Sequence, residues 1–180
     1  MTVWKPPDIE SLIDLEAFER DERIPYWADV WESAIVLAEE LSMLEAAGRT
    51  LLELGCGLGL PALVAARKGF LVTATDYEQP ALEGLVYTAG LNDVPCPETR
   101  IVDWRNPPDD LGRHDLVVAA DVLYERHHPA ALAGVLLRSL EPTGEAIVAD
   151  PCRQVAGAFP AACHAAGLTM EKTPARRPHG

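Results

Sequence analysis

A glycine-rich stretch is the first candidate for a ligand site. The residues LLELGCGLGLPALVAARKG, 51–69, place Gly55, Gly57 and Gly59 directly after a short apolar run. Glycine has no side chain, so the backbone can approach a ligand closely. The dinucleotide fingerprint is G-x-G-x-x-G, whereas the spacing here is G-x-G-x-G, which points away from a pyrophosphate held on a helix N-terminus. The loop predicts a site for an adenosine-like ligand; a tight turn without a ligand is the alternative.

An acidic residue follows the next strand-like segment, FLVTATD, which ends at Asp76. In doubly wound sheets, a carboxylate at the end of the second strand accepts hydrogen bonds from ribose hydroxyls. The alternative is that Asp76 caps the helix that begins near Pro80. The glycine loop and the acid occur in the right order, and this order favours the ligand.

A second polar group ends the apolar segment DLVVAADVLY, where Asp121 and Tyr124 stand. A carboxylate at the tip of an apolar strand, beside the point where strand order reverses, is costly unless it has a function. We therefore expect both residues to act in the site. The alternatives are that Asp121 caps the following segment and that Tyr124 is a core aromatic.

The elements that must position these residues alternate between strands and helices. Apolar runs that read as strands are separated by helical segments, several of which carry a proline at their start. This alternation predicts the α/β class, with a doubly wound, mostly parallel sheet covered on both faces. The length of 180 residues suits a single domain. We divide it into an N-terminal arm and helix (1–48), a Rossmann-like core (49–173) and a tail (174–180).

Composition excludes some classes of partner. With 15 basic and 28 acidic residues, the net charge is −13, which argues against nucleic acid and is compatible with a cationic substrate. The four cysteines lie far apart and the histidines have no ligand partners at helical spacing, so we expect no metal site and no disulfide framework. We read His127 and His128 as surface or helix-start residues. Without an apparent signal peptide or apolar span, the expected location is the cytoplasm, away from membranes.

The motifs LELGCGLGLP and TDYEQPALE resemble those of the class I, seven-strand S-adenosylmethionine (SAM) methyltransferases. More specific are IPYWADVWESAIVLAEEL before the glycine loop, VDW at 102–104 and AADVLYE at 119–125. Together they resemble the lysine-methyltransferase-like branch, which includes the enzyme that methylates the electron-transfer flavoprotein β-subunit and its bacterial relatives. That branch has a D-x-x-Y element, matched here by Asp121 to Tyr124.

The resemblance implies SAM as the cofactor and a role for each matched residue. Glu53 and the glycine loop would line the methionine side, Asp76 would bind the ribose, and Asp103 and Trp104 would lie by the adenine. Trp31 would close over the cofactor from the N-terminal helix. Asp121 and Tyr124 would be catalytic, facing the methyl group and the incoming nucleophile. The complete implied cofactor set is Trp31, Glu53, Gly55, Cys56, Gly57, Gly59, Asp76, Tyr77, Asp103, Trp104 and Ala120.

The implied reaction is N-methylation of a protein lysine or a small amine. A lysine has a reference pKa near 10.4 and must lose a proton before it attacks. An apolar pocket would lower that pKa, and Asp121 could hold or accept the proton. Two other classes remain open: a non-catalytic SAM-fold binding module, and an NAD-type oxidoreductase, for which we can place no catalytic residues.

The family's sheet ends with a hairpin for which little sequence remains here. Residues 167–173 can supply one strand, but PARRPHG, 174–180, has two prolines and no apolar alternation. We therefore predict six strands, with the last strand of the family absent. The strand GEAIVAD would then pair with 167–173 or present an open edge, and an open edge makes a homodimer or a partner-supplied strand plausible.

Overall fold

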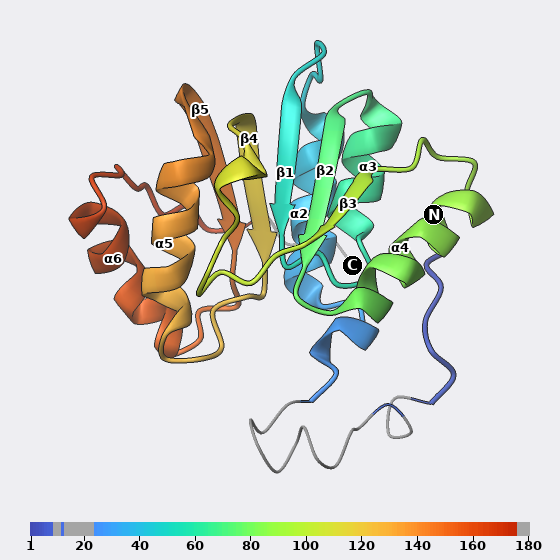
Figure 1. Ribbon diagram of the computed structural model, residues 1–180, viewed down its shortest axis with the longest axis horizontal. Coiled ribbons are helices and arrows are strands. Elements are labelled where there is room, and N and C mark those ends of the chain that lie inside the picture. The colour runs from blue at the N-terminus through green and yellow to red at the C-terminus, as the bar shows by residue number, and fades with distance from the viewer. Residues whose placement is uncertain (9–11, 13–23, 176–180) are drawn as a thin grey trace.

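A parallel sheet forms the centre of the molecule (Figure 1). The structure is a computed structural model that describes residues 1–8, 12 and 24–175. In the described residues the strand order is β3-β2-β1-β4-β5, and every neighbouring pair is parallel. Strand order therefore reverses between β1 and β4, as in a doubly wound sheet. The strands are β1 (Thr50–Leu54), β2 (Leu71–Asp76), β3 (Glu98–Ile101), β4 (His114–Ala120) and β5 (Leu140–Ala149).

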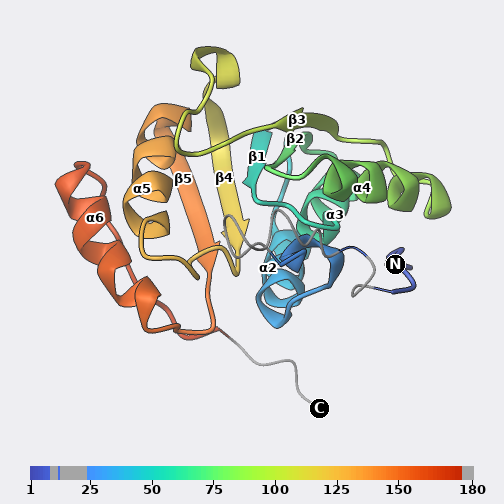
Figure 2. The same ribbon diagram turned by 60° about the horizontal axis from the view of Figure 1, so that its bottom comes forward.

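Helices cover both faces of this sheet, which confirms the predicted fold class (Figures 1 and 2). One face packs on α2 (Glu32–Met43), α3 (Leu60–Lys68) and α4 (Gln79–Leu91), and its core includes Leu37, Leu63 and Leu85. The other face packs on α5 (His128–Ser139) and α6 (Phe159–Ala165), around Leu132 and Leu136. Short 3-10 helices lie at η2 (Tyr26–Ala28), η3 (Asp109–Leu111) and η4 (Val155–Ala158).

Proline and glycine set several helix ends as the sequence predicts. A proline occupies the first turn of α3, α4, α5 and α6, where its missing N–H has no intrahelical partner to lose. Gly69 ends α3 in the left-handed conformation, with φ of 96°. Pro160 lies in the first turn of α6, directly after the 3-10 helix η4.

The first residues of the N-terminal arm run along α4. The Thr2 N–H donates to Oδ1 of Asn92 at 2.8 Å, and the Trp4 N–H donates to Oγ1 of Thr88 at 3.1 Å. The Trp4 ring also packs edge-on against Tyr87, with 6.0 Å between the ring centroids. Trp4 thus anchors the arm on α4. The rest of the arm, residues 9–11 and 13–23, lies outside the described residues.

The predicted sixth strand at 167–173 is wrong, because the described chain has no strand after β5. Gly167 has φ of 82° and its N–H donates to the carbonyl of His164, while the Leu168 N–H donates to the carbonyl of Cys163. This is a Schellman motif, in which the residue after the glycine packs back on its own helix. Leu168 accordingly packs against the core beside α6, and the chain does not return to the sheet.

The outer edge of β5 consequently has no partner strand in the described part of the chain. Residues 174 and 175 form no strand, as predicted, and residues 176–180 lie outside the described residues. Pairing of this edge with a second chain stays a prediction. No helix among the described residues combines the length and the apolar character needed to cross a bilayer.

Candidate active site

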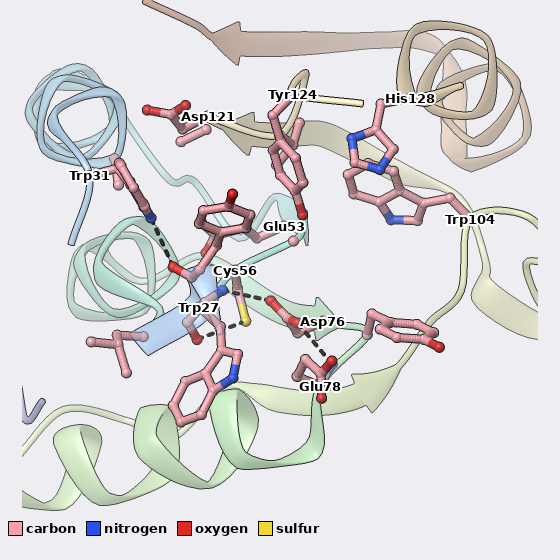
Figure 3. A pocket seen from close by; sticks show the side chains of 18 of the residues that line it. Trp27, Trp31, Glu53, Cys56, Asp76, Glu78, Trp104, Asp121, Tyr124 and His128 are labelled. Carbon is pink, nitrogen blue, oxygen red and sulfur yellow. Dashed lines mark hydrogen bonds between the residues drawn. The ribbon is translucent and has the colours of Figure 1, made fainter. Parts of the chain in front are cut away.

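A cavity of about 350 Å³ opens at the carboxyl ends of β1, β2 and β4, where the strand order reverses (Figure 3). Its volume lies in the range of small-molecule sites. All the residues that the sequence predicts for the site line it: Trp31, Glu53, Gly55, Cys56, Gly57, Gly59, Asp76, Tyr77, Asp103, Trp104, Ala120, Asp121 and Tyr124.

The glycine loop packs against the backbone of the N-terminal segment. Gly57 has φ of 51°, and a Cβ atom placed there would lie 3.3 Å from the carbonyl oxygen of Trp27. A larger residue would adopt this left-handed backbone at a cost and would need the Trp27 backbone to shift slightly, so the position favours glycine. Cys56 is buried beside it, and burial raises the pKa of its thiol, so the thiol stays protonated.

Two buried carboxyl groups lie at this side of the cavity. Glu53 on β1 is 1% exposed, and its Oε2 accepts the N–H of Ala62 from the first turn of α3 at 2.8 Å. Burial raises the pKa of Glu53 to about 8, with a further contribution from the charge of Asp76. Glu53 is therefore largely protonated at pH 7 when no cation is present.

Asp76 bonds with both of its oxygens to backbone groups around the cavity. Oδ2 accepts the N–H of Gly57 at 2.8 Å, and Oδ1 accepts the N–H of Glu78 at 2.9 Å. The residue in the N-cap position of α4 is Glu78, so the reading of Asp76 as that helix's N-cap is wrong. Burial raises the pKa of Asp76, and the backbone hydrogen bonds act in the opposite direction.

Beside Asp76, the cavity combines a second acid with aromatic rings. Arg105 binds the carboxylate of Asp103 through Nη2 at 2.8 Å, and its guanidinium lies 5.5 Å from the centre of the Tyr77 ring. Trp104 packs edge-on against His128, with 5.6 Å between ring centroids (Figure 3). Flat apolar surfaces with one polar edge suit a purine base.

Asp121 and Tyr124 line the cavity from the segment after β4, with Asp121 between Trp31 and Tyr124 in the view of Figure 3. β4 ends at Ala120, and Asp121 then adopts the left-handed conformation with φ of 58°. Tyr124 contacts the rings of Tyr26 and His128 at 5.3 and 4.6 Å. Burial, with the charge of Glu125, raises the pKa of Tyr124 to about 12, so its hydroxyl is neutral at physiological pH.

The two tryptophans near the N-terminus do not share a helical face. Trp27 belongs to η2, whereas Trp31 precedes α2 in an extended conformation, and Asp29 between them is also extended. No continuous helix runs through the two residues. Trp31 instead donates from Nε1 to the carbonyl of Tyr26 at 2.9 Å, and both tryptophans line the cavity.

His128 is a helix-start residue, as one of the two readings predicts, and not a surface residue. It is 8% exposed, begins α5, and lines the cavity beside Tyr124. Burial lowers its pKa, which favours the neutral imidazole. The turn before α5 also brings ligand atoms of Glu125, His127 and His128 within 4.8 Å of one another, close enough to hold a metal ion. Helical spacing could not predict this grouping, because Glu125 and His127 precede the helix that His128 begins.

Tyr26, Arg105, His128 and Arg153 are the main residues that sequence reasoning missed. Three of them line the cavity, while Arg153 bonds to Asp121 from the loop after β5. Their shared signal is position, since three lie just beyond strands or at the start of a helix, at the carboxyl edge of the sheet. Side chains from several strand ends converge there in open α/β sheets.

The fold and the cavity at the switch point define the class: this is a Rossmann-like SAM methyltransferase fold. A TehB-like SAM-dependent methyltransferase from Corynebacterium glutamicum superposes with a TM-score of 0.58 at 19% identity, over 77% of this chain and 73% of that one. The [4+2]-cyclase SpnF superposes with a TM-score of 0.59 at 23% identity, over 75% and 56%. At these identities the likeness establishes the fold alone.

The chain belongs to the lysine methyltransferase family, whose model matches residues 14–157. It is 37% identical to the protein N-lysine methyltransferase METTL21A of Danio rerio, over 73% of this chain and 62% of that protein. It is 31% identical to EEF1A lysine methyltransferase 3 of Mus musculus, over 76% and 60%. The chain thus spans about three fifths of the length of these relatives.

Proposed function

We propose that this protein is a SAM-dependent N-methyltransferase that acts on a protein lysine. One observation carries the proposal: a single cavity is lined both by the glycine loop with Asp76 and by Asp121 with Tyr124. A site with both sets of groups can hold a nucleoside cofactor and an acceptor amine together. The names of the relatives support a protein lysine over a small amine.

The residues present fit SAM as the cofactor. The buried carboxyl groups Glu53 and Asp76 suit a ligand with a sulfonium and an ammonium group, and the aromatic rings at Trp104 and Tyr77 suit a purine. When bound, SAM supplies an electrophilic methyl group. Glu53 and the glycine loop would hold its methionine end, Asp76 its ribose, and Asp103 and Trp104 its adenine. Ala120 would form part of the floor.

The acceptor side would act by orienting an amine and removing its charge. Tyr26, Trp31 and Tyr124 surround the approach to Asp121 with aromatic surface, which lowers the pKa of a lysine placed there. Asp121 would hold the ammonium and accept its proton, and the neutral hydroxyl of Tyr124 would accept a hydrogen bond from the amine. Most of the rate acceleration would then come from alignment of the amine.

Two observations bear on the cellular compartment and on the substrate. All four cysteines are free, which agrees with a reducing cytoplasm. The net charge of −13 favours a basic region around the target lysine.

Ligand screening followed by methyl transfer tests this proposal. We expect SAM and S-adenosylhomocysteine to raise the melting temperature of the protein and NAD to leave it unchanged. Incubation of a lysate with labelled SAM should then place label on lysine, located by mass spectrometry of the labelled protein. Stabilisation by NAD without a response to SAM would contradict the cofactor, and binding without transfer to any protein or amine would indicate a non-catalytic module.

A further inference from the structure

Arg153 connects the proposed acceptor side to two other elements. It follows β5, and its Nε donates to Oδ1 of Asp121 at 2.9 Å. Its Nη2 bonds to the same oxygen. The guanidinium also lies 5.9 Å from the centre of the Trp31 ring, at the start of α2. A single side chain thus links the ends of β4 and β5 to the N-terminal segment.

The position of Asp121 calls for such a partner. Its side chain is 5% exposed, and a carboxylate so deeply buried is costly without a charged hydrogen-bond donor. The fork of the guanidinium approaches from one side and takes only Oδ1. Oδ2 accepts no hydrogen bond from any group in the described part of the chain. One oxygen is therefore held while the other remains for a ligand.

The loop that carries Arg153 is itself fixed. The Arg153 N–H donates to Oδ1 of Asp150 at 2.9 Å, and Cys152 adopts a positive φ of 66°. The Asp121 N–H donates to the carbonyl of Ala149 at 2.9 Å, so the two strand ends stay in register up to these loops. This backbone framework sets the direction from which the guanidinium reaches the carboxylate.

We propose that Arg153 is a positioning residue for methyl transfer. It holds the Asp121 carboxylate through Oδ1 and leaves Oδ2 directed to the ammonium of the acceptor, and its stacking on Trp31 keeps the aromatic wall in place beside that oxygen. The inference rests on the proposed function, because it assigns Asp121 to the acceptor. It differs from a purely structural ion pair in that loss of Arg153 should affect the acceptor reaction far more than cofactor binding.

The test compares Arg153→Ala and Arg153→Lys with the wild-type protein. Initial rates of labelled-methyl transfer into lysate protein are measured at several concentrations of lysate protein. The Kd of S-adenosylhomocysteine is measured by calorimetry. We expect Arg153→Ala to transfer about 10- to 100-fold more slowly at saturating SAM, the size of effect that a misplaced group produces. The Kd should stay within about threefold, and Arg153→Lys should recover part of the rate.

A double-mutant cycle separates positioning from general damage. In an Asp121→Ala background, Arg153→Ala should cause little further loss, because the residue acts through Asp121. Arg138→Ala is the matched control, since Arg138 pairs with the exposed Asp109 and does not line the cavity. Melting temperatures identify any unfolded variant, in which case Arg153→Gln and Arg153→Lys replace it.

Two results would overturn the inference. Arg153→Ala could transfer methyl groups at the wild-type rate, or it could lower the rate by the same factor in the wild-type and in the Asp121→Ala background. A wild-type protein that binds no SAM and transfers no methyl group would instead refute the proposed function, and the role of Arg153 with it. The wild-type measurement therefore distinguishes the two failures.

Discussion

The backbone N–H of Gly57 donates a 2.8 Å hydrogen bond to Oδ2 of Asp76. The same carboxylate therefore fixes the glycine loop and faces the cavity. Loop geometry and ligand binding are coupled through this one side chain, because a carboxylate oxygen can accept a second hydrogen bond.

Replacement of Asp76 tests this coupling. Asp76→Ala should weaken binding of SAM and S-adenosylhomocysteine by about 1–3 kcal/mol, the usual cost of losing hydrogen bonds to a charged group. Calorimetry measures the affinity, and Glu39→Gln, an exposed acid on α2, serves as the control for the lost charge. An unchanged affinity for the Ala variant would remove Asp76 from the proposed ribose site.

Asp121→Asn and Tyr124→Phe should lower methyl transfer by about 10-fold or more and leave the cofactor's Kd near the wild-type value. Both side chains line the cavity from the segment that follows β4. Single-turnover transfer to the identified acceptor measures the effect. Full turnover by either variant would show that its residue has no part in the reaction.

Gly59→Ala should lower the free energy of unfolding by about 2–5 kcal/mol, because a Cβ atom at this position combines a left-handed conformation with overpacking. Gly59 has φ of 75°, and its Cβ would lie 2.2 Å from Cδ1 of the fully buried Leu85. Gly134→Ala is the control, since Gly134 lies within α5 with nothing within 4 Å. That change should stabilise the protein by about 0.5–1 kcal/mol. Denaturant unfolding that gives both variants the same stability would contradict the close packing of Gly59 against Leu85.

Glu53 predicts a pH dependence in the ligand-free protein. Its pKa is raised from 4.5 to about 8, so the folded state retains a proton that the unfolded state releases. The stability from this group is complete below pH 4.5 and falls as the pH rises through about 8. Glu53→Gln cannot ionise, so its free energy of unfolding should fall less between pH 5 and pH 8. Parallel pH profiles for the two proteins would show that Glu53 ionises normally.

Much of the fold and site was predictable because local signals and topology agree. The span of α3 follows from Pro61 and Gly69, and the placement of Asp76 and Asp121 follows from the convergence of strand ends at one edge. Those signals depend only on neighbouring residues or on the order of the strands. They can therefore be recognised without knowledge of side-chain packing.

The features that escaped prediction depend on contacts distant in sequence or on how a helix ends. Arg153 reaches Asp121 only because β5 pairs beside β4, and no spacing along the chain encodes that approach. The strand expected at 167–173 has apolar residues, but the Leu168 N–H bonds to the carbonyl of Cys163 and its side chain packs beside α6. Trp27 and Trp31 have helical spacing, yet the extended Asp29 separates them.

The N-terminal segment, residues 24–31, forms part of the cavity wall, so the cavity does not belong to the sheet alone. Ile24, Tyr26, Trp27 and Trp31 line the cavity, and the backbone of Trp27 lies against Gly57. The cavity is thus formed by the sheet and by a segment that precedes it. A truncated protein that began at Thr50 would keep the sheet and the helices that follow it but only part of the cavity wall. Exchange of residues 24–31 with those of a relative would change this wall of the cavity while the strands beneath it stayed the same.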